Sequence, residues 1–212
     1  MGRTALIAGT TGLIGKELLD LLLADAHYDR VLALSRKPLN PHPKLETIIV
    51  NLDEWEKLQN LKADDVFCCL GTTMKQAKTK AAFRKVDFEY PLQLATALKQ
   101  NGATTFLLVS ALGANKSSGI FYNKVKGEVE DAIGSLAFNA THIFRPSLLL
   151  GDRNEQRSGE DAAKVFYKFF GFLIPKKYKG VEGAKVARAM QREAKSAKQG
   201  LHVYESVQLQ NY

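Results

Sequence analysis

The run TALIAGTTGLIG occupies residues 4–15 and decides the fold. Residues 4–8 are apolar and β-prone, and residues 13–24 repeat their apolar positions at helical spacing. A tight turn from strand to helix needs the backbone freedom of Gly9, a diphosphate can touch the main chain where Gly12 has no side chain, and close helix packing favours Gly15. Amide groups at the start of the helix would face the phosphates. The order strand, glycines, helix therefore predicts a dinucleotide-binding turn, which a lone glycine pattern would not.

The same alternation of short apolar runs and longer helical stretches continues through most of the chain. The runs lack period-two alternation, as expected for strands that are covered on both faces. The sequence therefore predicts an α/β fold of the Rossmann type, a doubly wound, mostly parallel sheet with helices on both faces. We expect strands at residues 4–8, 31–35, 47–50, 65–70, 105–110, 141–144 and 201–205, and helices at 13–24, around 55–61, 88–101 and 122–136.

Length and composition favour a single NAD(P)-binding domain over residues 1–212. The chain has 212 residues, 45% of them apolar, which suits one substantial core. Residues 151–183 break the alternation with glycine, proline and charged residues around an aromatic stretch. In a doubly wound fold we expect this excursion at the carboxyl edge of the sheet, where it would shape a substrate pocket.

Composition also narrows the partners and the location. No apolar run approaches the roughly 20 residues of a membrane helix, so we expect no membrane partner. Adjacent Cys68 and Cys69 offer neither a disulfide framework nor a spaced metal-ligand set, and the isolated histidines add none, so we expect no metal and a cytoplasmic location. The net charge is +8, but the basic residues are scattered along the chain instead of forming a patch. Nucleic acid is therefore the partner that we expect least. We expect a monomer or a weak homodimer.

The end of the second expected strand bears on which dinucleotide is bound. An acidic side chain there would accept hydrogen bonds from an unphosphorylated ribose, whereas Arg36 can pair with a 2′-phosphate and Ser35 can donate to it. The sequence therefore favours NADP over NAD. The alternative is a pair of solvated bases, Arg36 and Lys37, after a strand.

Tyr122 and Lys126 stand four residues apart in an expected helix, hence on one face. A phenol has a pKa of about 10 in water, and a neighbouring ammonium ion stabilises the phenolate. Tyr122 would then give a proton to a carbonyl oxygen as hydride arrives from a nicotinamide. The alternative is an ordinary, partly exposed helix face.

Ser110 ends the apolar run 106–109, where a hydroxyl at the carboxyl end of a strand would stand beside the reacting carbonyl. It is the expected third member of a Ser/Tyr/Lys mechanism. The alternative is a serine that starts a turn.

The ordered set of these motifs resembles the atypical short-chain dehydrogenases/reductases. The set comprises the glycine turn, the 70–73 stretch, Ser110, the pair Tyr122 and Lys126, and residues 145–146. The resemblance implies that residues 51–52 lie against the adenine, that 71–73 contact the adenine-side ribose and the diphosphate, and that 145–146 run beside the nicotinamide. The residues expected to contact the cofactor are Gly9, Thr11, Gly12, Leu13, Ile14, Gly15, Ser35, Arg36, Asn51, Leu52, Leu70, Gly71, Thr72, Thr73, Ser110, Tyr122, Lys126, Arg145 and Pro146.

The chain departs from this pattern at one position. Relatives commonly carry two serines after the fifth strand, whereas here Ser110 is followed by Ala111. The resemblance implies an NADP(H)-dependent oxidoreductase that interconverts a carbonyl and an alcohol, acting on an unknown small-molecule substrate. The missing serine supports a competing hypothesis, a non-catalytic or redox-sensing NADP(H)-binding regulatory protein.

Overall fold

A seven-stranded sheet forms the centre of the computed structural model, which describes residues 2–151 and 178–212. The strand order is β3-β2-β1-β4-β5-β6-β9, and every pairing is parallel. The chain winds outward from β1 to β3 and starts again at β4 on the other side of β1, which confirms the predicted fold class. The strands are β1 (Arg3–Ala8), β2 (Tyr28–Ser35), β3 (Leu45–Ile49), β4 (Asp65–Cys68), β5 (Thr105–Val109), β6 (Ala140–Arg145) and β9 (Gly200–Glu205).

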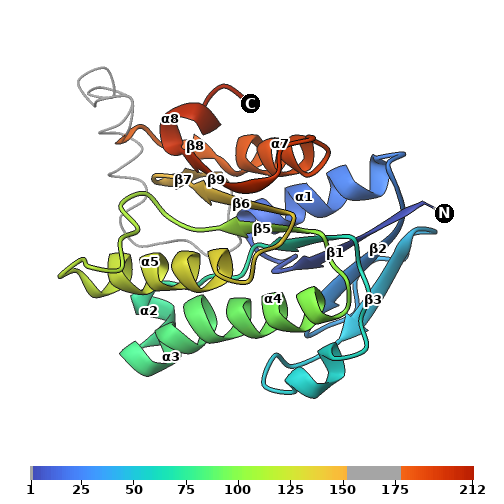
Figure 1. Cartoon of the computed structure of the whole chain (residues 1–212), viewed down its shortest axis with the longest axis horizontal. Helices are drawn as coiled ribbons and strands as arrows, with labels where there is room; N and C mark the ends of the chain where they lie inside the picture. Colours follow the sequence, from blue (N-terminus) through green and yellow to red (C-terminus); the bar gives the residue numbers. More distant parts are fainter. Residues whose placement is uncertain (1, 152–177) are drawn as a thin grey trace.

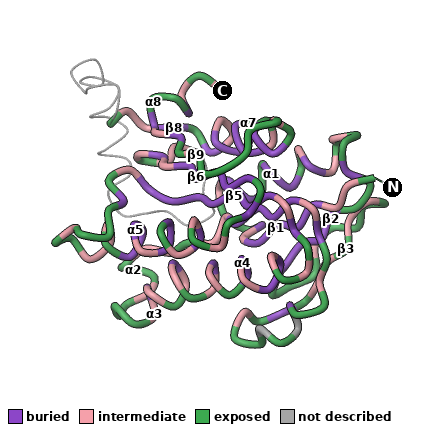
Figure 2. Tube along the Cα trace, viewed as in Figure 1, coloured by how far each residue is buried: buried purple, intermediate pink, exposed green. Residues whose placement is uncertain are grey.

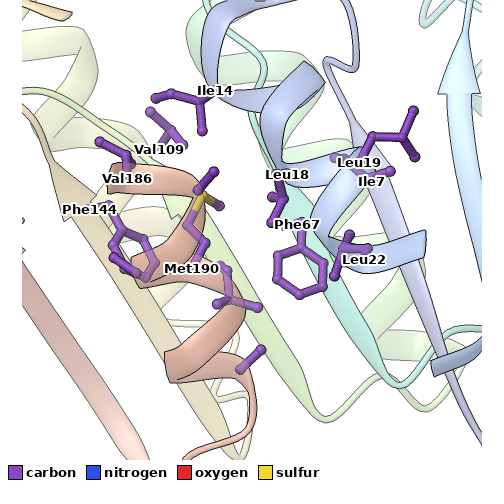
Figure 3. Packing of buried hydrophobic residues seen from close by; sticks show 14 of the residues in the cluster. Ile7, Ile14, Leu18, Leu19, Leu22, Phe67, Val109, Phe144, Val186 and Met190 are labelled. Carbon is purple, nitrogen blue, oxygen red and sulfur yellow. The ribbon is translucent and has the colours of Figure 1, made fainter. Parts of the chain in front are cut away.

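Helices cover both faces of the sheet (Figure 1). Helices α1 (Leu13–Ala24) and α7 (Gly183–Ala194) pack side by side on one face, and α4 (Tyr90–Gln100) and α5 (Phe121–Gly134) cover the other. Each interface holds its own apolar cluster. Figure 3 shows the first cluster, in which Leu18 of α1 and Met190 of α7 meet Phe67 of the sheet.

The central strands are apolar throughout because neither face meets water. Residues 5–8 of β1 are each fully buried, and the central strands are largely buried along their length (Figure 2). Within residues 2–151 and 178–212, no helix is both long and apolar enough to cross a membrane.

A π-helical turn interrupts the long helix that precedes β5. Helix α3 (Lys80–Arg84) runs into the π-helical turn Lys85–Glu89 and then into α4. Pro91, in the first turn of α4, has no amide proton to donate to the carbonyl four residues earlier, at Asp87. The missing bond explains why the regular α-helical ladder is broken at this turn.

Several elements differ from the sequence-based prediction. Residues expected as a helix at 55–61 form only a 3-10 turn (Trp55–Leu58), and the fourth strand ends at Cys68 instead of residue 70. Helix α7 was not predicted: its apolar residues share one face, but they are mostly small and stand among many charged residues, so the segment as a whole is polar. The short helices α2 (Met74–Ala77) and α8 (Ser206–Leu209) were also missed.

The two ends of the 151–183 excursion meet near the glycine turn. Strand β7 (Leu149–Leu150) pairs in parallel with β8 (Val181–Glu182). A Cβ atom added to Gly183 would lie 2.2 Å from Cδ2 of Leu13 and one added to Gly151 would lie 2.7 Å from it, so both ends pack on the first residue of α1. Residues 152–177, which make up most of the excursion, lie outside the described residues.

Candidate functional site

The turn after β1 requires glycine at two positions. Gly9 has a φ of +92°, and a Cβ atom there would lie 2.5 Å from the carbonyl oxygen of Cys69. A Cβ atom at Gly15 would lie 2.1 Å from the carbonyl oxygen of Gly9, so only glycine lets α1 start this close to the strand. Among the described residues, the one contact of a Cβ atom at Gly12 would be the Gly9 carbonyl oxygen at 3.4 Å, so none of them fills the space in front of Gly12.

Polar groups of this turn fit a dinucleotide diphosphate. Gly12 is the N-cap of α1 and provides no side-chain cap, which leaves the first amide groups of the helix for a ligand or water. The hydroxyl of Thr10 is buried, and within the described part of the chain it has no hydrogen-bond partner. Uncapped amides, a buried hydroxyl and an open space are the features that a bound diphosphate would complete.

The residues expected around the adenosine half lie at the ends of β2 and β3. The hydroxyl of Ser35 donates to the carbonyl of Lys37 at 2.7 Å and accepts from its amide at 3.2 Å, so it is engaged in a local turn. Arg36 is exposed to solvent. Asn51 is exposed, and Leu52 packs against the α4 and α5 cluster.

The 70–73 stretch connects the glycine turn to α5. Leu70 packs against the α4 and α5 cluster, and Gly71 follows it at the open edge. Thr73 caps α2 by accepting from the amide of Gln76 at 3.2 Å. A Cβ atom at Gly71 would lie 3.7 Å from Nζ of Lys126. Because Gly9 already touches Cys69, the glycine turn, this stretch and Lys126 form one continuous surface.

Lys126 and Tyr122 lie one turn apart on α5 in different surroundings. Tyr122 is half-buried, with its ring centroid 5.5 Å from that of Phe83. The Lys126 side chain is only 6% exposed, and its Nζ lies 2.7 Å from Oδ1 of Asp87. Burial opposes the charge of Lys126, but the Asp87 carboxylate outweighs this effect and the pKa of Lys126 is raised.

Ser110 points to a second buried carboxylate. Its hydroxyl donates to Glu130. Arg145 also donates to Glu130, from Nε at 3.0 Å and from Nη2 at 2.5 Å, and its Nη1 donates to Glu205 at 2.9 Å. Glu130 is two turns beyond Tyr122, about 12 Å along the helix axis. The role predicted for Ser110 in positioning a carbonyl would require its hydroxyl to turn away from Glu130.

The sequence analysis missed Asp87 and Glu130. Their sequence signals were an acid four residues before Pro91 and an acid four residues after Lys126. Pro146 follows Arg145 at the end of β6, where its carbonyl accepts from the amide of Leu112 at 2.9 Å. Within residues 2–151 and 178–212, no group of three or more His, Cys, Asp or Glu side chains is placed to hold a metal ion.

Fold and glycine turn together define the class of protein, a Rossmann-type member of the short-chain dehydrogenases/reductases. The chain belongs to the NAD dependent epimerase/dehydratase family, which residues 5–127 match. This confirms the predicted resemblance to the atypical short-chain dehydrogenases/reductases.

Two curated relatives resemble most of the chain. Protein FMP52, mitochondrial, of Debaryomyces hansenii is 35% identical over 195 residues, which cover 87% of this chain and 85% of that protein. Protein HTATIP2 of Rattus norvegicus is 37% identical over 177 residues, which cover 81% of this chain and 72% of that protein.

Solved structures share the fold at low sequence identity. The Bordetella bronchiseptica enzyme WbmH, solved in complex with NAD+, has a TM-score of 0.75 and 17% identity, and the match covers 97% of this chain and 76% of that one. At this identity the likeness concerns the fold alone.

The cytoplasmic location expected from the sequence is wrong by this comparison. The FMP52 relatives from Debaryomyces hansenii, Candida glabrata and Scheffersomyces stipitis are named mitochondrial. Unpaired cysteines indicate only a reducing compartment, so they could not separate the two locations.

Proposed function

We propose that the chain is an NADP(H)-dependent oxidoreductase that interconverts a carbonyl and an alcohol on a small-molecule substrate. The observation that carries the proposal is the continuity between the glycine turn and the Tyr122 and Lys126 pair. Gly9 touches Cys69, and Gly71 lies beside the Lys126 ammonium ion. A dinucleotide with its diphosphate on the glycine turn would therefore extend toward α5.

In this proposal each residue has one role. The glycine turn and the start of α1 hold the diphosphate. The bound dinucleotide supplies or accepts hydride. Tyr122 gives a proton to the substrate oxygen in reduction and takes it back in oxidation. Lys126 has three protons, of which one faces Asp87, so the others are available for a ribose hydroxyl and the phenol.

The preference for NADP rests on Arg36. Its guanidinium is exposed at the end of β2, where a 2′-phosphate could accept two hydrogen bonds from it. Arg36→Ala is expected to weaken NADPH binding about tenfold and to leave NADH binding nearly unchanged. Equal losses for both dinucleotides, measured by calorimetry, would contradict the NADP preference.

Substitution of Tyr122 tests the reaction. Tyr122→Phe is expected to lower NADPH-dependent turnover of an aldehyde and ketone panel by about 10² to 10⁴-fold, because the proton donor is lost. Its dinucleotide affinity should stay within about twofold of the wild type. Tyr90→Phe is the matched control, because Tyr90 is a partly exposed phenol that donates to Asp53. Unchanged turnover in Tyr122→Phe would refute the mechanism.

A second candidate is a non-catalytic NADP(H)-binding regulatory protein. Two observations favour it: the Ser110 proton is donated to Glu130, and the next residue is Ala111. Tight NADPH binding without turnover of any panel carbonyl would select this candidate. Installing the missing hydroxyl with Ala111→Ser should raise turnover if the oxidoreductase proposal holds.

We also propose a mitochondrial location, because the FMP52 relatives carry that word in their names. A fluorescent fusion that stays diffuse and separate from a mitochondrial marker would contradict it.

A further inference from the structure

A buried carboxylate lies where two parts of the proposed active site meet. Asp87 is 1% exposed. Its Oδ1 lies 2.7 Å from Nζ of Lys126, and its Oδ2 accepts from the amide of Thr72 at 2.9 Å. One side chain thus joins the helix that carries Tyr122 to the 70–73 stretch.

The backbone around Asp87 explains why the carboxylate points inward. Asp87 lies in the middle of the π-helical turn Lys85–Glu89. Such a turn inserts an extra residue into the helical repeat and rotates the following side chains relative to an α-helix. Pro91 leaves the Asp87 carbonyl without its usual helical donor. Pro91 therefore disfavours a regular α-helix at this turn, and within the turn the Asp87 side chain points toward Lys126 and Thr72.

The charge of Lys126 depends on this carboxylate. The groups that face Lys126 are the Cys68 thiol from β4, the Tyr122 phenol from α5 and the Asp87 carboxylate from the π-helical turn. Burial raises the pKa of Cys68 to about 12, so the thiol stays neutral. The nearby side chains of Arg84 and Glu128 form an ion pair with each other, so the charge of Glu128 is already balanced. Among residues 2–151 and 178–212, Asp87 is therefore the negative group that balances the buried ammonium ion.

We propose that Asp87 is a positioning residue: it holds the Lys126 ammonium ion against the 70–73 stretch and supplies the counter-charge that lets it stay charged while buried. This inference rests on the proposed function for the role of Lys126. Asp87 was not among the residues predicted for the site from the sequence, and the structure adds it from the π-helical turn Lys85–Glu89.

The first test measures the protonation of Lys126 in the protein without cofactor or substrate. Lysine labelled with ¹³C gives a Cε signal that shifts when the ammonium ion loses its proton, and Lys126→Met identifies the signal. In the wild type we expect no shift between pH 6 and about 9, because the pKa of an ordinary lysine is about 10.4 and Asp87 raises the pKa of Lys126. A wild-type signal that titrates below about pH 9 would overturn the proposal.

Two variants and a control isolate Asp87. In Asp87→Asn the Lys126 signal should titrate at least about two pH units lower, since a buried amine without a counter-charge loses its proton readily. Asp87→Glu should restore the wild-type behaviour. Asp53→Asn is the control, because Asp53 pairs with Lys85 of the same turn while both side chains are 46% exposed. An unchanged Lys126 titration in folded Asp87→Asn would overturn the proposal.

A failure to fold is also informative. If Asp87→Asn does not fold, the double variant Asp87→Asn/Lys126→Met should fold, because the unpaired buried charge is removed together with its partner. If the double variant also fails to fold, balancing the charge of Lys126 is not the role of Asp87, and the proposal is overturned.

The titration stays valid if the chain proves to have no turnover, so failure of the proposed function is separable from failure of this inference. Where turnover is found, Asp87→Asn should lower kcat about tenfold and change the pH profile. Asp87→Glu should recover part of the loss.

Discussion

Glu130 and Glu193 are both buried carboxylates, but they lie on opposite faces of the sheet and serve different purposes. Glu130, on α5, accepts from Ser110 and Arg145. Glu193, on α7, accepts from Tyr204 and Tyr212 at 2.7 Å each and from Lys198 at 2.8 Å. Both are satisfied by several donors, as a buried charge must be.

The difference lies in where the partners come from. Those of Glu193 are 5 to 19 residues away, all in the last part of the chain, so this cluster fastens β9 and the C-terminal residues to α7. Those of Glu130 come from the ends of β5 and β6, which hold residues predicted for the site. A buried carboxylate by itself therefore does not mark a functional site; Glu130 differs from Glu193 in lying beside residues at the carboxyl edge of the sheet, where open α/β folds bind ligands.

The Glu193 cluster also fixes a neutral histidine. Tyr204 gives its proton to Glu193, so His142 must donate from Nδ1 to the Tyr204 oxygen, 3.0 Å away. Among the described residues Nε2 of His142 has no hydrogen-bond partner. Burial, followed by repulsion from His202, lowers the pKa of His142 to about 4.

Replacing each carboxylate in turn should give the largest contrast. Glu193→Gln is expected to cost about 3 to 4 kcal/mol of stability, because three donors lose a charged acceptor, and to leave dinucleotide affinity unchanged. Glu130→Gln should cost about 2 kcal/mol, because Arg145 keeps Glu205, and should weaken turnover or dinucleotide binding. Urea unfolding and calorimetry measure both effects. A loss of dinucleotide binding in Glu193→Gln would contradict the conclusion that the two carboxylates serve different purposes.

Two groups of the Glu193 cluster, His142 and Glu193 itself, should make the stability of the chain depend on pH. Because the pKa of His142 falls from 6.5 to about 4 on folding, the unfolded chain binds the extra proton, and stability drops by up to about 3 kcal/mol as pH falls from 6.5 to 4. Burial alone would raise the pKa of Glu193, but its donors lower it to about 2, so its contribution is present above pH 4.5 and lost toward pH 2.

A histidine variant isolates the first of these two windows. His142→Gln should flatten the dependence of stability on pH between 6.5 and 4. His202→Gln, which changes the half-buried ring stacked on His142, should retain most of this dependence, because burial is the larger cause of the lowered His142 pKa. A slope that persists in His142→Gln would show that other groups produce it.

The smallest expected effect belongs to Ser110. Ser110→Ala removes one hydrogen bond to Glu130 and should cost about 1 kcal/mol. If Ser110 only supports Glu130, turnover should fall less than about threefold. A loss of turnover as large as that expected for Tyr122→Phe would instead support the predicted role of Ser110 in positioning the carbonyl. Steady-state kinetics with NADPH distinguish the two results.

Much of the fold could be read from the sequence because its signals are local. The continuous apolar runs of β1 and β5 indicate strands covered on both faces, and the glycines after β1 indicate a tight strand-to-helix turn. Helix α7 was missed because its charged residues make the segment polar on average, although its small apolar residues share one face. Composition could not identify the compartment, because unpaired cysteines suit any reducing one.

For the site, the sequence by itself determined the elements that depend on short spacing: the glycine turn, and Tyr122 with Lys126 on one helix face. Only the tertiary structure decided their partners, since Asp87 reaches Lys126 and Glu130 takes the Ser110 proton across gaps of 39 and 20 residues. Such pairs depend on which strands and helices become neighbours. Helical periodicity and turn chemistry act within a few residues, whereas burial selects partners wherever the chain brings them together.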